Sequence, residues 1–210
     1  MKKFVKMGVA LATVLMLTIS CGTNKTEKEA NMNSEVKEQA LEVLKNRRAI
    51  RSYSSEMPAK ELIDKVIEAG TYAPTGMGKQ SPIIVAVTNK EVRDKLSALN
   101  AQVIGGDRGD PFYGAPVVLV VLADKQYSTY IYDGTLVMGN LLNAAYACGL
   151  GSCWIHRAKE VFDSAEGKAL LKEWGIEGDY EGIGNCILGY ETGEHPQAKP
   201  RKENYVYRIE

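Results

Sequence analysis

The chain has 210 residues, of which 45% are hydrophobic and 25% charged, and its 26 basic and 26 acidic side chains give a formal net charge of zero. This length suffices for a single domain with a substantial core. The balanced charge argues against a nucleic-acid surface, which would show a strong basic excess. The two histidines, His156 and His195, are far apart and lack metal-ligand spacing, so we predict no metal site.

The first twenty residues have the features of a bacterial export signal. Three lysines precede an uncharged run from Met7 to Ser20, and Cys21 follows directly. A basic start and a short apolar core are typical of a secretory signal, and the run is shorter than the roughly 20 apolar residues of a transmembrane helix. Residues 17–21 resemble a lipobox, although Thr18 stands three positions before the cysteine, where leucine is usual.

We therefore expect a signal peptide at residues 1–20 and a lipidated Cys21 that anchors the protein to a bacterial membrane, on the periplasmic or cell-surface side. Secretion with an unmodified Cys21 is the alternative. Residues 21–33 are polar and lack aromatic side chains, which predicts a flexible tether. Residues 34–210 are expected to form one domain.

Within this domain the apolar pattern predicts helices that alternate with strands. Helices are predicted at 34–48, 58–69, 90–99, 127–148 and, in two pieces broken at Gly167 or earlier, 158–174; strands are predicted at 83–87, 116–122, 152–155 and 185–190. Gly70 is expected to end the second helix, and the tail after Gly193 to be extended. The helix at 127–148 is apolar on more than one face, which favours the core or a subunit interface. By pattern alone, the alternation favours a parallel, doubly wound sheet.

Besides Cys21 the chain has three cysteines, Cys148, Cys153 and Cys186, each in an apolar or glycine-rich neighbourhood. Such surroundings favour buried free thiols. Pairing of two of the three is the alternative in an exported protein.

Two basic clusters lie near opposite ends of the predicted domain. Arg47, Arg48 and Arg51 follow the first helix, and Lys199 and Arg201 lie in the tail. Cations at the end of a helix also interact favourably with its macrodipole, which by itself would explain two of the arginines. Arginine forks are, in addition, well shaped to bind a phosphate group.

Two loops of small residues adjoin apolar elements: Ala73-Pro74-Thr75-Gly76, followed by Gln80, and Gly149-Leu150-Gly151-Ser152-Cys153-Trp154. Glycine lets a backbone approach a flat ligand, although such loops often serve only as turns. With the basic clusters they would suit flavin mononucleotide (FMN). The dinucleotide fingerprint, the P-loop, the nucleophile elbow and the zinc-binding helix are missing from the sequence. Asp107 and Asp110 lie in a polar linker and are interpreted as solvated.

In order and spacing these motifs resemble the nitroreductase family. The resemblance spans roughly residues 35–210 and is carried by segments 47–53, 73–80, 115–116, 140–145, 149–154 and 199–202. It implies an α+β fold with a central mixed, largely antiparallel sheet instead of a doubly wound one. It also implies a domain-exchanged homodimer with two FMN molecules at the interface.

The resemblance further implies roles for individual residues. The phosphate clamp is expected to consist of Arg47, Arg48 and Arg51, with Ala49 among them, and of Lys199 and Arg201. Pro74, Thr75, Gly76 and Gln80 are expected along the isoalloxazine ring, usually from the partner subunit, with Trp154, Ile155 and His156 past its other side. The family commonly has asparagine at the position of Gly78 and Pro-Trp after the glutamine, so an amide contact to the flavin is either missing here or supplied by Lys79 or Gln80.

The implied activity is an FMN-dependent oxidoreductase that transfers hydride from NADH or NADPH to a nitroaromatic or quinone-like acceptor. No catalytic acid, base or nucleophile stands out, because the flavin carries the chemistry. His156 is a candidate proton donor, with backbone contact alone as the favoured alternative. The other readings are an FMN-binding protein without turnover and a relative that cleaves flavin or dehalogenates aromatics. Residues 101–113 are expected to form a lid.

Overall fold

The computed structural model describes residues 35–105 and 109–210. The expected signal peptide, Cys21, the tether and part of the expected lid, with Asp107, lie outside the described residues. By internal contacts the chain divides into Met1–Glu42 and Val43–Glu210. Residues 35–46 are helical, and everything that follows concerns the unit Val43–Glu210.

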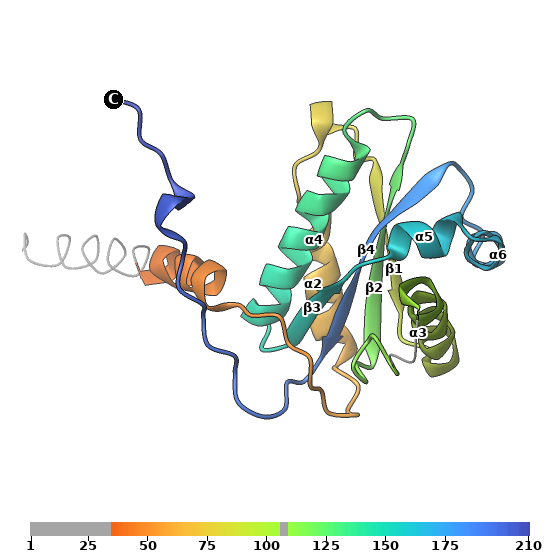
Figure 1. Ribbon diagram of the computed structural model, residues 1–210, viewed down its shortest axis with the longest axis horizontal. Helices are drawn as coiled ribbons and strands as arrows, with labels where there is room; N and C mark the ends of the chain where they lie inside the picture. Colours follow the sequence, from red (N-terminus) through yellow and green to blue (C-terminus); the bar gives the residue numbers. More distant parts are fainter. Residues whose placement is uncertain (1–34, 106–108) are drawn as a thin grey trace, which may run out of the picture. The chain divides into compact units, whose positions relative to one another are not determined.

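A four-stranded sheet forms the centre of this unit (Figure 1). Its strands are β1 (Pro82–Val87), β2 (Val117–Asp124), β3 (Gly151–Ile155) and β4 (Tyr180–Gly189). The order is β1-β2-β4-β3, and each neighbouring pair is antiparallel. A parallel bridge joins Ala49 to Ser152 at the β3 edge. The four strands therefore pair antiparallel, which confirms the largely antiparallel sheet that the resemblance implied; the parallel pairing in the described residues is the isolated bridge at Ala49. The parallel doubly wound sheet expected from the pattern alone is wrong.

The connection between β1 and β2 explains why the alternation of helices and strands wrongly suggested parallel strands. Helix α3 (Lys90–Ile104) leads away from the end of β1, and the loop after it returns to the start of the same helix. There the Asp110 carboxylate accepts hydrogen bonds from the Arg93 guanidinium and the Ser97 hydroxyl. The loop thus brings the chain back to the sheet end that it left, and β2 must run antiparallel to β1. The hydrogen bonds to Arg93 and Ser97 also show that Asp110 has a structural role and is not simply solvated, as the sequence had suggested.

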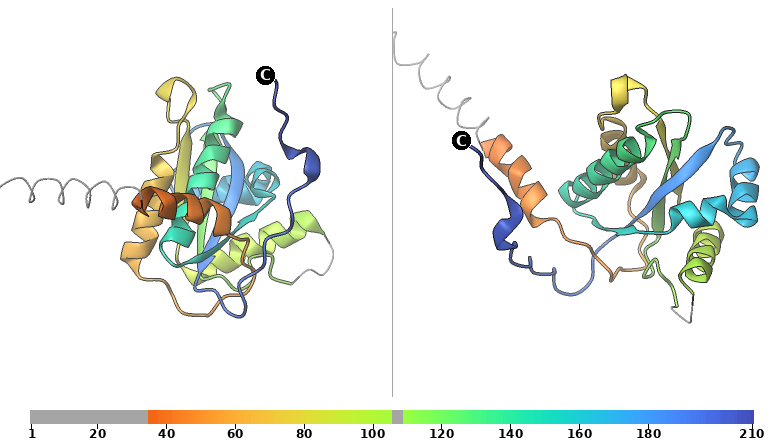
Figure 2. Two further views of the ribbon diagram at one scale, coloured as in Figure 1. Left: turned by 90° about the vertical axis from the view of Figure 1, so that its left-hand side faces the viewer. Right: turned by 45° about the horizontal axis from the view of Figure 1, so that its top comes forward.

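Helices cover both faces of this antiparallel sheet, and the antiparallel pairing makes the fold α+β instead of α/β. Helices α2 (Lys60–Thr71) and α4 (Tyr130–Ala147) pack on one face; α3, α5 (Ala158–Asp163) and α6 (Ala165–Glu173) pack on the other, as Figure 1 and the right-hand view of Figure 2 show. Strand β2 divides its side chains between the two layers, and from Val117 to Ala123 all are fully buried. The predicted break between α5 and α6 falls at Ser164, whose Oγ accepts a hydrogen bond from Gly167 N (3.0 Å).

The helix α4 lies in the core, as its apolar composition predicted, with seven buried residues. Its contact with α2 corrects the role expected for Gly70. A Cβ at Gly70 would lie 2.6 Å from Leu141 Cδ2, so this glycine lets the two helices approach each other, and α2 continues to Thr71. Within the described residues, no helix combines the length and apolar character needed to cross a membrane.

Cys148, Cys153 and Cys186 are free thiols; the prediction that they are also buried is confirmed for two of them, whereas Cys148 is half-buried. Cys153 and Cys186 are buried, and burial raises the pKa of each thiol.

Candidate functional site

The first basic cluster lies along the outer edge of β3. Ile50 N donates to Ser152 O (2.9 Å), and the bridge at Ala49 continues this pairing. A Cβ at Gly151 would lie only 3.0 Å from Ile50 Cγ2, so a glycine is needed for the two segments to pack this closely. The bridge at Ala49 and the hydrogen bond of Ile50 therefore hold residues 47–51 against β3, which places three arginines beside that strand.

The guanidinium groups of this cluster have no anionic partner within the described unit Val43–Glu210. Arg48 Nη1 donates to the carbonyl oxygens of Lys45 (2.7 Å) and Arg47 (2.8 Å), while its buried Nε has no hydrogen-bond partner. Arg51 makes only a long contact, 3.5 Å, to Ala49 O. Burial raises the pKa of Cys153, and Arg51 and Arg47 act against that rise, which puts both positive charges near β3. Within Val43–Glu210 the cluster is a cationic surface without an anionic partner, which suits it to an anion.

Residues 154–156 continue β3 beyond this cluster. Trp154 is half-buried, Ile155 is buried and His156 is exposed. The carbonyl oxygen of His156 accepts a hydrogen bond from Nδ2 of Asn100 (2.8 Å), a fully buried residue of α3. The backbone of Arg157 then turns into the left-handed region, with φ of 79°. The strand end is thus rigidly held by its backbone while the imidazole faces outward, which favours the backbone alternative for His156.

The loop of Pro74, Thr75 and Gly76 lies at the opposite corner of the sheet. It leads through the 3-10 turn η1 (Gly76–Gly78) to Gln80 and the start of β1. Gln80 N donates to Thr75 Oγ1 (3.0 Å), which closes the loop. Thr75 and Gln80 line a cavity of about 420 Å³ whose other walls are largely apolar residues of α2, β1 and α4.

A single chain does not bring this loop to the arginine cluster. Pro82 pairs with Ala123 on the β1 edge, whereas Ser152 pairs with Leu188 on the β3 edge, level with Val117. With about 3.4 Å per residue along a strand and about 4.8 Å between strands, the two corners are roughly 25 Å apart. Figure 1 shows η1 and the segment around residue 50 at opposite ends of the sheet. A site that uses both must take the loop from a second copy of the chain.

Lys199 and Arg201 lie in the exposed tail, which is extended as predicted up to the short turn η2 (Glu203–Tyr205). Arg201 donates through Nε (3.2 Å) and Nη2 (2.6 Å) to Lys199 O. In the described residues neither side chain contacts the first cluster. The segment that carries them is nevertheless fastened beside it, because Nε2 of His195 lies 3.1 Å from Asn46 O, directly before Arg47.

Sequence reasoning missed two residues that organise these segments. His195 joins the tail to the end of the first helix, and its Nδ1 also bonds Glu191 Oε2 (2.9 Å). Asp133 is buried in the first turn of α4 and accepts hydrogen bonds from the loop around Gly76. Local signals are weak for both residues: Glu191 and His195 are four residues apart, as are Thr129 and Asp133. The partners that join Asp133 to the loop, Gly76 and Ser81, lie more than fifty residues away.

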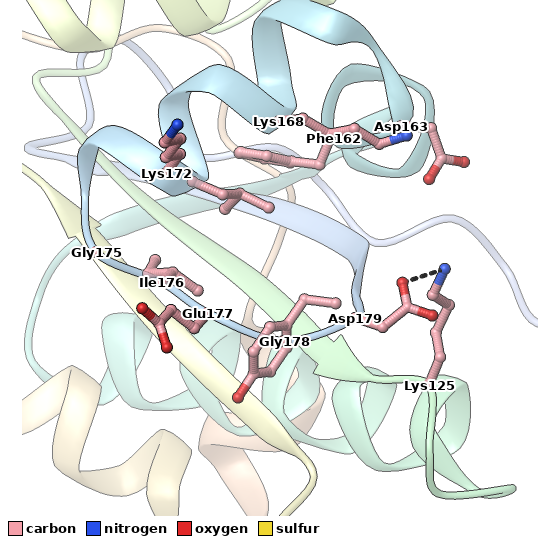
Figure 3. Close-up of a pocket in the computed structure, with 12 residues that line it drawn as sticks. Lys125, Phe162, Asp163, Lys168, Lys172, Gly175, Ile176, Glu177, Gly178 and Asp179 are labelled. Atoms are coloured by element: carbon pink, nitrogen blue, oxygen red, sulfur yellow. Dashed lines mark ion pairs between the residues drawn. The ribbon is translucent and has the colours of Figure 1, made fainter.

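A second cavity, of about 340 Å³, lies elsewhere, between α5, α6 and the start of β4 (Figure 3). It is lined by Phe162, Lys168, Lys172 and Ile176, with the ion pair of Lys125 and Asp179 (2.6 Å) at one side. None of the predicted cofactor-binding residues lines this cavity.

The family model described as "Nitroreductase family" matches residues 44–105 and 106–190, more than half of the chain. The chain belongs to the nitroreductase family. The match includes the arginine cluster, the 73–80 loop and β3, and it ends before the tail with Lys199 and Arg201.

Relatives and solved structures agree with this assignment. A protein of Archaeoglobus fulgidus named "Putative NADH dehydrogenase/NAD(P)H nitroreductase" is 30% identical over 163 residues, 75% of this chain and 88% of the relative. A protein of the same name from Methanothermobacter thermautotrophicus is 29% identical over 118 residues, which are 54% of this chain but only 59% of that relative. A nitroreductase with bound FMN from Bacteroides fragilis superimposes with a TM-score of 0.75 at 25% identity, covering 81% of this chain and 98% of that one.

Proposed function

We propose that this member of the nitroreductase family is an FMN-dependent oxidoreductase that takes hydride from NADH or NADPH and reduces a small nitroaromatic or quinone-like acceptor. The observation that carries the proposal is the cluster of Arg47, Arg48 and Arg51, which has no carboxylate partner within Val43–Glu210 and lies beside the held end of β3. The FMN bound by the Bacteroides fragilis structure and the names of the relatives support the cofactor and the nicotinamide donor.

The residues present fit the phosphate end of FMN. Arg51 is exposed and makes only a long hydrogen bond, and the buried Nε of Arg48 has no hydrogen-bond partner, so the cluster retains donor capacity. Lys199 and Arg201 would complete the clamp from the tail, which His195 fastens beside the first cluster. Charge-assisted hydrogen bonds to a phosphate are stronger than neutral ones, so this clamp would supply much of the affinity.

The isoalloxazine end of FMN would be bound by residues of two subunits. Trp154, Ile155 and His156 of one subunit would lie past one side of the ring, and Pro74, Thr75, Gly76 and Gln80 of the other subunit along it. Large apolar side chains that a single chain leaves exposed support a domain-exchanged homodimer: Ile131, Tyr132 and Leu136 on α4, and Tyr205, Val206, Tyr207 and Ile209 in the tail. A second copy of the chain would cover these surfaces.

Bound FMN supplies the hydride chemistry, and the chain binds it, orients it and excludes competing reactions. The backbone of residues 154–156 orients the isoalloxazine ring, because pairing with β4 and the hydrogen bond from Asn100 hold this backbone segment rigidly. His156 contributes to this role through its backbone, while its side chain is exposed.

The predicted export signal favours one competing function. Little NAD(P)H is available outside the cytoplasm, so a protein anchored there through Cys21 would either take electrons from another donor or hold FMN without turnover. Steady oxidation of NADH or NADPH in the presence of a quinone or nitroaromatic acceptor separates the enzyme from the carrier. A protein that binds FMN but shows no turnover with any donor would favour the carrier.

The phosphate clamp is tested by replacing its arginines. Arg47→Ala and Arg201→Ala should each weaken FMN binding by about 1.5–3 kcal/mol, the scale of a hydrogen bond to a charged group. Arg208→Ala, a charge loss in the same exposed tail, is the matched control and should leave the affinity unchanged. Fluorescence titration of FMN into the apoprotein measures all three. Wild-type affinity in both clamp variants would remove the clamp from the proposed function.

A further inference from the structure

Asp133 is a buried carboxylate that nothing in the sequence motifs singled out. It lies in the first turn of α4, and its residue is only 2% exposed. Oδ1 accepts a hydrogen bond from Gly76 N (2.9 Å), and Oδ2 accepts from Ser81 Oγ (2.7 Å) and Thr129 Oγ1 (3.0 Å). In the described residues no cation pairs with this carboxylate, so its charge is balanced by hydrogen bonds and by the positive end of the α4 macrodipole.

These hydrogen bonds hold both ends of the loop that we assign to the flavin ring. Gly76 begins the turn η1, and Ser81 directly precedes β1. A Cβ at Gly76 would lie 2.3 Å from Thr129 Oγ1, so the backbone of the loop is seated directly against the start of α4. The Thr75 hydroxyl then closes the loop by accepting from Gln80 N.

The protonation state of Asp133 suits this role. Burial acts to raise the pKa of the carboxyl, but the hydrogen bonds from Ser81, Gly76 and Thr129 outweigh burial and lower it. The carboxylate is therefore ionised at neutral pH, and all of its contacts are with donors. An ionised acceptor buried among donors is a rigid support, because moving any of its partners leaves a charge unsatisfied.

We propose that Asp133 is a positioning residue for the flavin: it fixes the backbone of Thr75 and Gly76 in the position that contacts the isoalloxazine ring bound by a second subunit. This inference rests on the proposed function. Because the loop serves the partner's site, Asp133 acts across the subunit interface. Its loss should alter ring binding at the site whose arginine cluster belongs to the other chain.

The first test compares Asp133→Ala and Asp133→Asn with Leu170→Ala, which destabilises the core on the other face of the sheet, away from the loop. We expect Asp133→Ala to weaken FMN binding at least tenfold and to change the visible circular dichroism of bound flavin. Asp133→Asn should stay within about threefold of wild type, because its oxygen can accept from Gly76 N while the Ser81 hydroxyl turns to accept from its amide. Leu170→Ala should lower the melting temperature and change neither flavin property.

The second test is complementation between subunits. A mixed dimer of Arg47→Ala and Asp133→Ala chains should contain one site in which both the arginine cluster and the loop are intact. Refolding the two defective variants together should therefore restore up to half of the wild-type FMN binding per heterodimer. Should Asp133→Ala fail to fold alone, Ser81→Ala, which removes one donor to the carboxylate, takes its place in both tests.

The outcomes separate the inference from the function on which it rests. Wild-type protein that binds no FMN overturns both. Wild-type protein that binds FMN, together with an Asp133→Ala variant that is less stable but has normal flavin affinity and circular dichroism, overturns only the positioning role. Failure of the mixed dimer to recover binding would overturn action across the interface.

Discussion

Gly184 on β4 allows a sharp test of how the candidate ring-binding strand is packed. A Cβ at this position would lie 2.5 Å from Nε1 and 2.8 Å from Cε2 of Trp154, and 3.2 Å from Cε of Met138. Ordinary contacts between such atoms are about 3.5–4.0 Å. In Gly184→Ala the indole must therefore move by roughly 1 Å. Met138 is fully buried and Trp154 half-buried, so the indole should move outward.

The expected cost follows from this displacement. Adding a methyl group to a packed interior typically costs about 1–3 kcal/mol. Since Trp154 can yield toward solvent, we expect Gly184→Ala to lower the free energy of unfolding by about 1–2 kcal/mol. The moved indole should also weaken FMN binding, because Trp154 belongs to the strand end that we assign to the ring.

The assay is urea unfolding together with tryptophan fluorescence. The chain has two tryptophans, so a Trp174→Phe background leaves Trp154 as the reporter, and its emission should shift toward that of an exposed indole. Gly139→Ala on α4 is the matched control. The added Cβ meets no atom within 4 Å, so the substitution should raise the free energy of unfolding by about 0.5–1 kcal/mol. Unchanged stability and emission in Gly184→Ala would refute the packing on which the prediction depends.

Four further predictions address the assembly, the tail, the mechanism and the anchor. Sedimentation should show a dimer even at low protein concentration, and deletion of residues 203–210 should weaken it; a stable wild-type monomer with bound FMN would contradict the shared site. Hydrogen bonds to Glu191 and Asn46 O raise the pKa of His195 above its ordinary 6.5, so the stability that the protonated ring contributes is full below about pH 6.5 and is lost as pH rises through the higher folded pKa. The unfolding free energies of wild type and His195→Ala should accordingly converge toward pH 9. A difference between the two that grows with pH would contradict a raised pKa of His195 in the folded protein. His156→Ala should leave flavin reduction within a few-fold of wild type, whereas a loss of two orders of magnitude with FMN still bound would mark a general acid. Mass spectrometry of native membranes should find an N-terminal peptide that begins at acylated Cys21, and a soluble wild type with an unmodified Cys21 would exclude the anchor.

The apolar pattern of the sequence was sufficient to locate most secondary structure. The run of valine and leucine around β2 and the many apolar positions of α4 correctly predicted a buried strand and a core helix. Buried elements need apolar side chains whatever the order and direction of the strands. The strand β4 shows where this reasoning ends. It begins five residues before the predicted start at Asn185, because Gly182 and Gly184 interrupt the apolar run. Both are buried strand residues whose missing Cβ leaves room for Ala158 and Trp154.

For the site, the sequence by itself determined which residue types were available: the arginine cluster, the loop of small residues and the strand end at Trp154, in an order typical of one family. The alternation of helices and strands is the same for parallel and antiparallel sheets, so the pattern alone did not decide the direction of the strands; the family resemblance implied it and the tertiary structure established it. It also placed the loop and the arginines at opposite corners of the sheet, so that one chain alone does not complete the site. The roles of Asp133 and His195 emerged only there as well, because their partners Gly76 and Asn46 lie 57 and 149 residues away along the chain. Local patterns report on neighbouring residues, whereas a hydrogen bond across such distances exists only once the chain has folded.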